Sequence, residues 1–167
     1  MPETETVWES SPWWLSFRAD PEGAAFADRH YSRKSEGSKQ FVMPGRCLCL
    51  VNDGAVWVTS WQSPQFVKHE WPDAWLCSLF RREHGPQAST LIRWAVAHSR
   101  WKFGAPPSSG MITFVDESKV RRKRDAGRCF RKAGFEPVGR TKDRRLIVLQ
   151  CLPEAMPEAR PPAGQLL

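Results

Sequence analysis

The sequence predicts a single α/β (α+β) domain built on a mixed β-sheet. The chain has 167 residues, the size of one ordinary domain, and its 41% hydrophobic and 26% charged residues are typical of a globular protein. Short apolar segments alternate with helical patterns, which indicates strands joined by crossover helices. One pair of segments carries a hairpin signature, and an antiparallel hairpin makes such a sheet mixed.

The two ends of the chain are expected to be flexible, because residues 1–12 and 153–167 contain prolines and lack apolar periodicity. The folded domain is expected over residues 13–152. The first five residues (MPETE) are acidic where a signal peptide would be basic, and no apolar run approaches the roughly 20 residues of a membrane-spanning helix. These features predict a cytoplasmic protein without a membrane partner.

A helix and a hairpin come first. Asp20 followed by Pro21 is typical of a helix start and predicts a helix that ends near His30. An Asn-Asp-Gly-Ala turn between two apolar segments then predicts a hairpin, with strands at residues 47–51 and 56–60.

Strands and helices alternate in the second half. A strand over residues 75–80 precedes a helix over residues 88–103, which carries an apolar stripe and ends before a Gly-Ala-Pro-Pro sequence. A fully apolar strand over residues 111–115 follows. Asp125 is expected to cap a short helix, and residues 146–152 are apolar enough for a central strand.

The five cysteines are expected to be reduced and mostly buried, since their number is odd and four lie in apolar stretches. Cys47 and Cys49 would share one face of a strand. The paired spacings of zinc sites are absent, so no structural metal is expected.

Residues 128–141 read RCFRKAGFEPVGRT, in which an aromatic-bearing helix ends in Ala-Gly-Phe before the last strand. This stretch and the order of elements resemble the GNAT N-acetyltransferase superfamily, over residues 20–152. The resemblance implies a GNAT-like fold, with a mixed, splayed sheet flanked by helices. It also implies an acyl donor that binds between two diverging strands, here residues 75–80 and 111–115.

Within that superfamily the chain looks most like phage Mom-type DNA-modification proteins. Four pieces match in order: residues 30–33 (HYSR), 80–83 (FRRE), 113–116 (TFVD) and 127–130 (GRCF). Those proteins convert the exocyclic amine of adenine into a carbamoylmethyl derivative. The resemblance therefore implies a transferase for nucleobase hypermodification of DNA, in the cytoplasm of a bacterium or a phage-infected host.

The donor loop departs from the superfamily pattern. GNAT acetyl-CoA sites show Arg/Gln-x-x-Gly-x-Gly/Ala, whose backbone N–H groups bind the pyrophosphate. Residues 82–87 keep Gly85 but end in glutamine, and Pro86 lacks a backbone donor. Ser89 and Thr90, at the helix start, can add hydroxyl groups to an anion site. The donor is expected to be acetyl-CoA or another acyl or aminoacyl donor.

Asp116, Tyr31 and Ser32 are candidates for the chemistry. Asp116 ends an apolar strand, where ligands of α/β sheets gather, and is either a general base with a pKa raised by burial or an N-cap. Tyr31, the only tyrosine, either protonates a leaving group or is an amphipathic residue at a helix end. Ser32 either binds a substrate or turns the chain.

Arg81 and Glu83 point the same way if the preceding strand continues. The arginine can hold an anionic or carbonyl group while the carboxylate acts as a base. The alternative is an ordinary surface ion pair. The similarity to Phe-Arg-Asn-Glu in the phage-type proteins favours the functional interpretation.

The net charge of +7 is concentrated in one region. Residues 119–145 hold 12 basic and 3 acidic side chains, a net +9, so the rest of the chain carries −2. A patch of this density predicts contacts with the phosphate backbone of DNA. The expected contacts are Lys119, Arg121, Arg122, Lys123 and Arg124. A solvated helix face and a site for the phosphates of CoA are the alternatives.

Trp61, Trp71 and Trp75 are either core residues or stack on an extruded base. The expected function is thus group transfer to adenine in DNA. Asp116 or Glu83 is the base, Tyr31 the acid and Arg81 an anchor. Two alternatives stay open: an acyl-CoA-dependent N-acyltransferase that acts on a small molecule or protein, and a non-catalytic nucleic-acid-binding protein.

Overall fold

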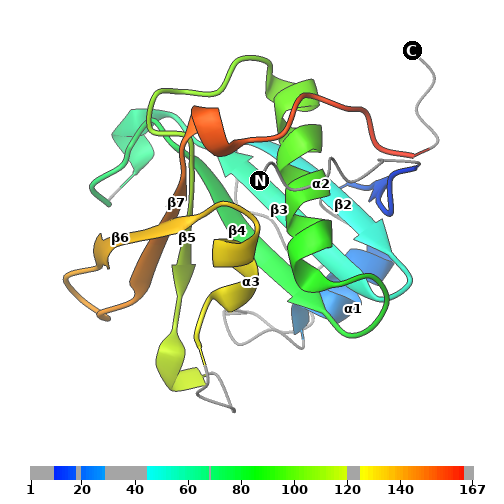
Figure 1. Cartoon of the computed structure of the whole chain (residues 1–167), viewed down its shortest axis with the longest axis horizontal. Helices are drawn as coiled ribbons and strands as arrows, with labels where there is room; N and C mark the ends of the chain where they lie inside the picture. Colours follow the sequence, from blue (N-terminus) through cyan, green and yellow to red (C-terminus); the bar gives the residue numbers. More distant parts are fainter. Residues whose placement is uncertain (1–9, 18–19, 29–44, 68, 120–124, 164–167) are drawn as a thin grey trace, which may run out of the picture.

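A computed structural model of the chain describes residues 10–17, 20–28, 45–67, 69–119 and 125–163. These residues form a seven-stranded sheet with helices on both faces (Figure 1). The strands are β1 (Trp14–Leu15), β2 (Arg46–Asn52), β3 (Ala55–Trp61), β4 (Trp75–Arg82), β5 (Met111–Val115), β6 (Glu136–Arg140) and β7 (Ile147–Cys151). The helices are α1 (Pro21–Asp28), α2 (Ala88–Phe103) and α3 (Arg128–Lys132), with short 3-10 turns η1 (Pro64–Phe66), η2 (Glu117–Lys119) and η3 (Pro153–Ala155). None of the described helices has the length and hydropathy needed to cross a membrane.

The strand order β1-β2-β3-β4-β5-β7-β6 makes the sheet mixed, as predicted. β4 and β5 are parallel, and the other neighbouring pairs are antiparallel. The predicted hairpin is present, with Asn52 paired to Ala55 across β2 and β3. α2 and β5 have the bounds that the sequence predicts, so strand, helix and parallel strand follow one another as a crossover unit.

Apolar side chains alternate between the two faces of the sheet. On one face Leu50 and Trp57 pack in a core shared with α2 and α3, which cover the near side in Figure 1. On the other face Val51 and Val58 pack with Phe26 of α1. The alternation of buried residues along β2 and β3 thus builds two separate cores.

β4 contains a bulge at Ser78. Val58 of β3 pairs with Leu79, but the next residue of β3 pairs with Cys77, so Ser78 has no opposite residue. The bulge shifts the alternation by one position: Cys77 packs in the α2-side core, whereas Leu79 packs in the α1-side core. Continued alternation places Arg81 on the α1 face.

The sequence-based prediction omitted two strands, which lie at the two edges of the sheet. β1 has only two residues and pairs Trp14 with Val51. β6 pairs with β7, with an irregularity between Pro137 and Gly139. A two-residue strand and a strand interrupted by proline and glycine lack the alternating pattern from which strands are predicted.

The start of α3 differs from the prediction, and its end agrees with it. Asp125 does not cap the helix; the N-cap is Gly127, with φ of 79°. The carboxylate of Asp125 instead pairs with Arg131. At the C-terminal end Gly134 has φ of 100°, and the N–H of Phe135 bonds back to the helix, which is the predicted glycine stop.

Residues 153–163 pack on the domain, which corrects the expectation of a flexible tail. Met156 is buried in the α2-side core. The N–H of Arg160 donates to the main chain of α2, and Ala163 bridges to Trp14 beside β1. The proline-containing residues 153–163 therefore form an extended segment that crosses α2 (Figure 1). This segment packs on the domain although its sequence has no apolar periodicity.

Candidate functional site

β4 and β5 separate toward their C-terminal ends. Three residue pairs join them, and the last is Cys77 with Thr113. Beyond this pair β4 continues along β3 to Arg82, while β5 continues along β7 to Val115 (Figure 1). At the point of separation, Thr113 Oγ1 donates a hydrogen bond to the carbonyl oxygen of Cys77 at 3.2 Å. The two strands expected to hold a donor therefore diverge.

Aromatic side chains pack beside this divergence. Phe80 of β4 and Phe130 of α3 meet edge to face with ring centroids 6.0 Å apart, and Trp57 of β3 packs against both. Burial raises the pKa of the Cys77 thiol, so this group stays neutral and does not act as a nucleophile. Trp57 and Phe130 are buried in the core, and Phe80 is half-buried beside them, so the surroundings of the divergence are apolar.

Arg82 holds the loop between β4 and α2. Its Nε donates to the carbonyl oxygen of Pro86 at 2.7 Å, and its Nη2 donates to that of Gly85 at 2.8 Å. Gly85 has φ of 100°, a conformation that glycine adopts at little cost. The guanidinium thus lies just before α2, where Ser89 and Thr90 occupy the first turn. A cation and unpaired helix N–H groups together favour an anion.

Arg82 is not among the functional residues predicted from the sequence. It is the first residue of the Arg-x-x-Gly spacing, which was the available signal. What the sequence did not show is that the side chain folds back onto the carbonyl groups of its own loop.

The turn between β2 and β3 packs against the same loop. The carbonyl oxygen of Gly54 accepts hydrogen bonds from the N–H of Glu83 at 2.6 Å and of His84 at 3.3 Å. A Cβ atom on Gly54 would lie 2.1 Å from the carbonyl oxygen of His84. Only glycine permits this approach, so the hairpin turn determines where the loop begins.

The carboxylate of Asp116 caps the turn after β5. Its Oδ1 accepts hydrogen bonds from Ser118 N at 3.1 Å and Ser118 Oγ at 2.5 Å, and its Oδ2 lies 3.5 Å from Nη2 of Arg144. The hydrogen bonds from Ser118, with smaller contributions from Arg144 and Lys119, lower the pKa of Asp116. A general base was expected to have a raised pKa. The structure corrects that expectation and supports the capping alternative.

Arg81 and Glu83 form an ion pair on the α1 face. Nε of Arg81 lies 3.0 Å from Oε2 of Glu83, and each side chain is about one-third exposed. The two side chains therefore point the same way, as the sequence predicts. A pair this exposed adds little to stability, and its carboxylate lies at the start of the loop that Arg82 holds.

Two further ion pairs connect the residues on either side of the basic stretch at 119–124 to α3 and to the β6–β7 hairpin. Nη1 of Arg140 lies 2.6 Å from Oε1 of Glu117, and Asp125 pairs with Arg131. Glu117 precedes residues 120–124 and Asp125 follows them. Both described ends of the basic stretch are thus tied to this edge of the sheet.

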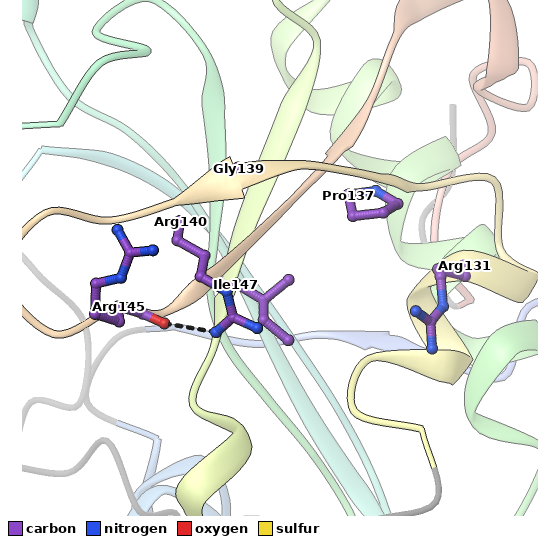
Figure 2. A pocket seen from close by; sticks show the side chains of 6 residues that line it. All are labelled: Arg131, Pro137, Gly139, Arg140, Arg145 and Ile147. Atoms are coloured by element: carbon purple, nitrogen blue, oxygen red, sulfur yellow. Dashed lines mark hydrogen bonds between the residues drawn. The ribbon is translucent and has the colours of Figure 1, made fainter.

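A surface hollow of about 530 Å³ lies between α3 and the β6–β7 hairpin. It is lined by Arg131, Pro137, Gly139, Arg140, Arg145 and Ile147. Figure 2 shows the Ile147 side chain between the guanidinium groups of Arg140 and Arg131, with Arg145 beyond Arg140. These arginines belong to the basic region at residues 119–145, but the sequence does not predict that three of them share one hollow.

Several predicted residues lie outside the described part of the chain. They are Tyr31, Ser32, Arg121, Arg122, Lys123 and Arg124. Their assigned roles stay predictions. Lys119, the remaining member of the expected backbone contact, is exposed at the end of η2.

Two of the three candidate stacking tryptophans belong to the core. Trp75 is fully buried and meets Trp61 edge to face at 5.8 Å, and the guanidinium of Arg46 covers Trp61 at 3.9 Å. For Trp75, which is fully buried, and for Trp61, which packs against the core, the structure supports the core alternative. Trp71 is half-buried and packs near the ring of His69.

Among the described residues, no group of three or more His, Cys, Asp or Glu side chains could hold a metal ion. The sulfur atoms of Cys47 and Cys49 lie 4.0 Å apart on one face of β2, and all five cysteines are free thiols. These two cysteines pack in the α1-side core.

Comparison with known proteins identifies no relative, since no family model, curated protein or solved structure matches the chain.

Proposed function

We propose that the protein is a GNAT-like transferase that moves an acyl or aminoacyl group onto the exocyclic amine of a nucleobase, adenine, in DNA. The observation that carries this proposal is the divergence of the parallel strands β4 and β5 beyond Cys77 and Thr113. A thioester donor such as acetyl-CoA would extend through this divergence, beside the half-buried ring of Phe80.

The phosphates of the donor would lie at the start of α2. Arg82 supplies a fixed positive charge there, and Gly85 gives the loop its path. Ser89 and Thr90 add first-turn N–H groups, which favour anions together with the helix dipole. A phosphate site here does not require the full GNAT loop pattern. Pro86 lacks a backbone N–H group, and the guanidinium of Arg82 supplies a positive charge in its place.

Transfer would be direct, without a covalent enzyme intermediate. The amine nitrogen attacks the carbonyl carbon of the donor and loses a proton to a base, while the carbon–sulfur bond breaks and the leaving thiolate takes up a proton. Glu83 is the proposed base, because the lowered pKa of Asp116 disfavours that residue. Arg81 positions Glu83 through their ion pair. Tyr31 is the proposed acid and Ser32 a substrate contact, both as predictions from the sequence.

The donor site is tested by titration of acetyl-CoA and free CoA in a calorimeter. The wild type is expected to bind the thioester, and Arg82→Gln to bind it about tenfold more weakly, because a charge-assisted phosphate contact is lost. Lys102→Gln removes the same charge from the last turn of α2 and serves as the control. Equal affinity of the Arg82 and Lys102 variants would contradict this placement of the phosphates.

The acceptor is tested by mass spectrometry of nucleosides from the DNA and tRNA of cells that express the protein. A modified adenine nucleoside is expected in DNA with the wild type and not with Glu83→Gln. Glu154→Gln, the same chemical change on exposed η3, should leave the modification unchanged. Thioester binding without any modified nucleoside would contradict the DNA acceptor and favour acylation of a small molecule or protein.

A further inference from the structure

We infer that the hollow between α3 and the β6–β7 hairpin binds the phosphodiester backbone of a nucleic acid. The inference deepens the proposed function, because it assigns a binding site to the DNA strand that carries the acceptor base. The assignment of that strand as an acceptor rests on the proposed function. It concerns residues other than the basic stretch at 119–124, and it can be tested by binding alone.

The lining of the hollow has the chemistry that a phosphodiester strand requires. None of its six residues is acidic, and Arg131, Arg140 and Arg145 supply three guanidinium groups. Ile147 and Pro137 form an apolar surface between them. Arginine binds phosphate through several N–H groups at once, and the apolar surface can contact sugars.

Two of the three guanidinium groups are held in place before any ligand arrives. Nη1 of Arg140 donates to Glu117 at 2.6 Å and to the carbonyl oxygen of Arg145 at 3.0 Å. A guanidinium has five N–H groups, so those on Nε and Nη2 remain for a ligand. Arg131 is held by Asp125. A pre-oriented side chain loses little conformational freedom when it binds.

Arg145 supplies the charge without a carboxylate partner. It forms no ion pair with any residue that the structure describes, and its side chain is exposed. Its φ of 54° makes it the one non-glycine residue with positive φ in the described ranges. Glycine would suit this backbone better. The presence of arginine and not glycine at position 145 is explained if the charge of Arg145 is used for binding.

The hollow is open to a ligand longer than itself. β6 is an edge strand, and all five of its residues are exposed. The turn that follows carries Lys142 and Arg144 together with Asp143, and both cations lie near carboxylates, of Glu70 and Asp116. A polymer can therefore run along the exposed edge strand and past the hollow, which favours a strand of nucleic acid over a small phosphate ester.

The experiment measures the affinity of the full chain for fluorescein-labelled single-stranded and duplex DNA over a series of salt concentrations. Two variants, Arg145→Gly and Arg140→Gln, are compared with the wild type. Each is expected to raise Kd about threefold to tenfold and to reduce the slope of log K against log salt by about 1. Lys102→Gln, which removes one positive charge from α2, is the matched control and should leave the slope unchanged.

Arg145→Gly separates binding from folding. Because glycine suits φ of 54°, this variant should melt at the same temperature as the wild type or higher, while its DNA affinity falls. Slopes equal to that of Lys102→Gln for both variants would overturn the inference. Competition by free ADP as effective per phosphate as competition by unlabelled DNA would also overturn it, since the ligand would then be a small phosphate ester.

The outcomes separate this inference from the proposed function. A reduced slope without any modified nucleoside would support the hollow and contradict the transferase. A modified nucleoside with an unchanged slope would support the transferase and contradict the hollow.

Discussion

The carboxylate of Asp116 lies 3.5 Å from the guanidinium of Arg144, so the residue that follows β5 is tied to the turn that precedes β7. The same carboxylate accepts two hydrogen bonds from Ser118. Both interactions stabilise the ionised form. Asp116 therefore organises the edge of the site, and the proton transfer is assigned to another carboxylate.

The first prediction concerns this division of roles. Asp116→Asn should retain most of the nucleoside-modifying activity, because asparagine can still accept the hydrogen bonds of Ser118. Glu83→Gln should reduce activity by about a hundredfold or more, which is typical of a lost general base. Product is quantified by mass spectrometry in cells with matched protein levels. If Asp116→Asn is as inactive as Glu83→Gln, Asp116 takes part in the chemistry.

The second prediction concerns His98, which is fully buried in α2. Its Nδ1 lies 2.6 Å from the carbonyl oxygen of Arg160 and its Nε2 lies 2.7 Å from Ser11 Oγ, so a neutral ring with the proton on Nδ1 fits both partners. Burial lowers the pKa of His98 from 6.5 to about 4. The unfolded chain therefore binds a proton between these pH values that the folded chain does not.

Stability should fall as the pH falls from 6.5 toward 4, by about 3 kcal/mol from this histidine. Asparagine can keep the bond to Arg160 but does not titrate, so His98→Asn should show a weaker loss over the same interval. Urea denaturation at several pH values measures the difference. Parallel curves for the two proteins would show that the histidine contributes nothing to the pH dependence.

The third prediction concerns Gly54. A methyl group there would lie 2.1 Å from the carbonyl oxygen of His84, so Gly54→Ala must push the hairpin turn and the β4–α2 loop apart. The expected cost is about 1–3 kcal/mol of unfolding free energy, with a loss of affinity for the donor. Asp53→Ala, in the same turn but exposed, is the control. If Gly54→Ala is destabilised but binds the donor as tightly as the wild type, the hairpin turn does not position the donor site.

The fourth prediction concerns a buried chain of hydrogen bonds under α2. Trp57 Nε1 donates to Thr59 Oγ1 at 2.7 Å, Thr59 Oγ1 lies 2.7 Å from Ser99 Oγ, and Ser99 Oγ donates to the carbonyl oxygen of Ala95. Thr59→Val leaves the indole N–H without an acceptor and should cost about 1–3 kcal/mol. Ser99→Ala leaves that bond intact and should cost less. The order of the two unfolding free energies tests the assignment, and the reverse order would contradict it.

The elements with strong local signals could be predicted from the sequence. The Asn-Asp-Gly-Ala turn, the apolar stripe of α2 and the apolar run of β5 each suffice to identify their element. The edge strands and the segment after Pro153 could not be predicted, because their positions depend on partners distant in the sequence.

Part of the candidate site could be predicted in the same way. The spacing of Arg81 and Glu83 predicts a shared side, and the ion pair is present. The bulge at Ser78 determines that Arg81 and Glu83 lie on the α1 face of the sheet. This bulge depends on the register of β4 with β3 and has no local sequence signal. The meeting of Arg131, Arg140 and Arg145 depends on how α3 packs against the hairpin.

The bridge between Trp14 and Ala163 has a consequence for how the protein is made. The last described residues pair with the first strand of the sheet, and Ala163 N donates to the carbonyl oxygen of Trp13. During synthesis β1 can pair with β2 early, but its contact with Ala163 forms only after all seven strands have been made. The contact of Arg160 with α2 is equally late, so this part of the surface is covered after the rest of the sheet.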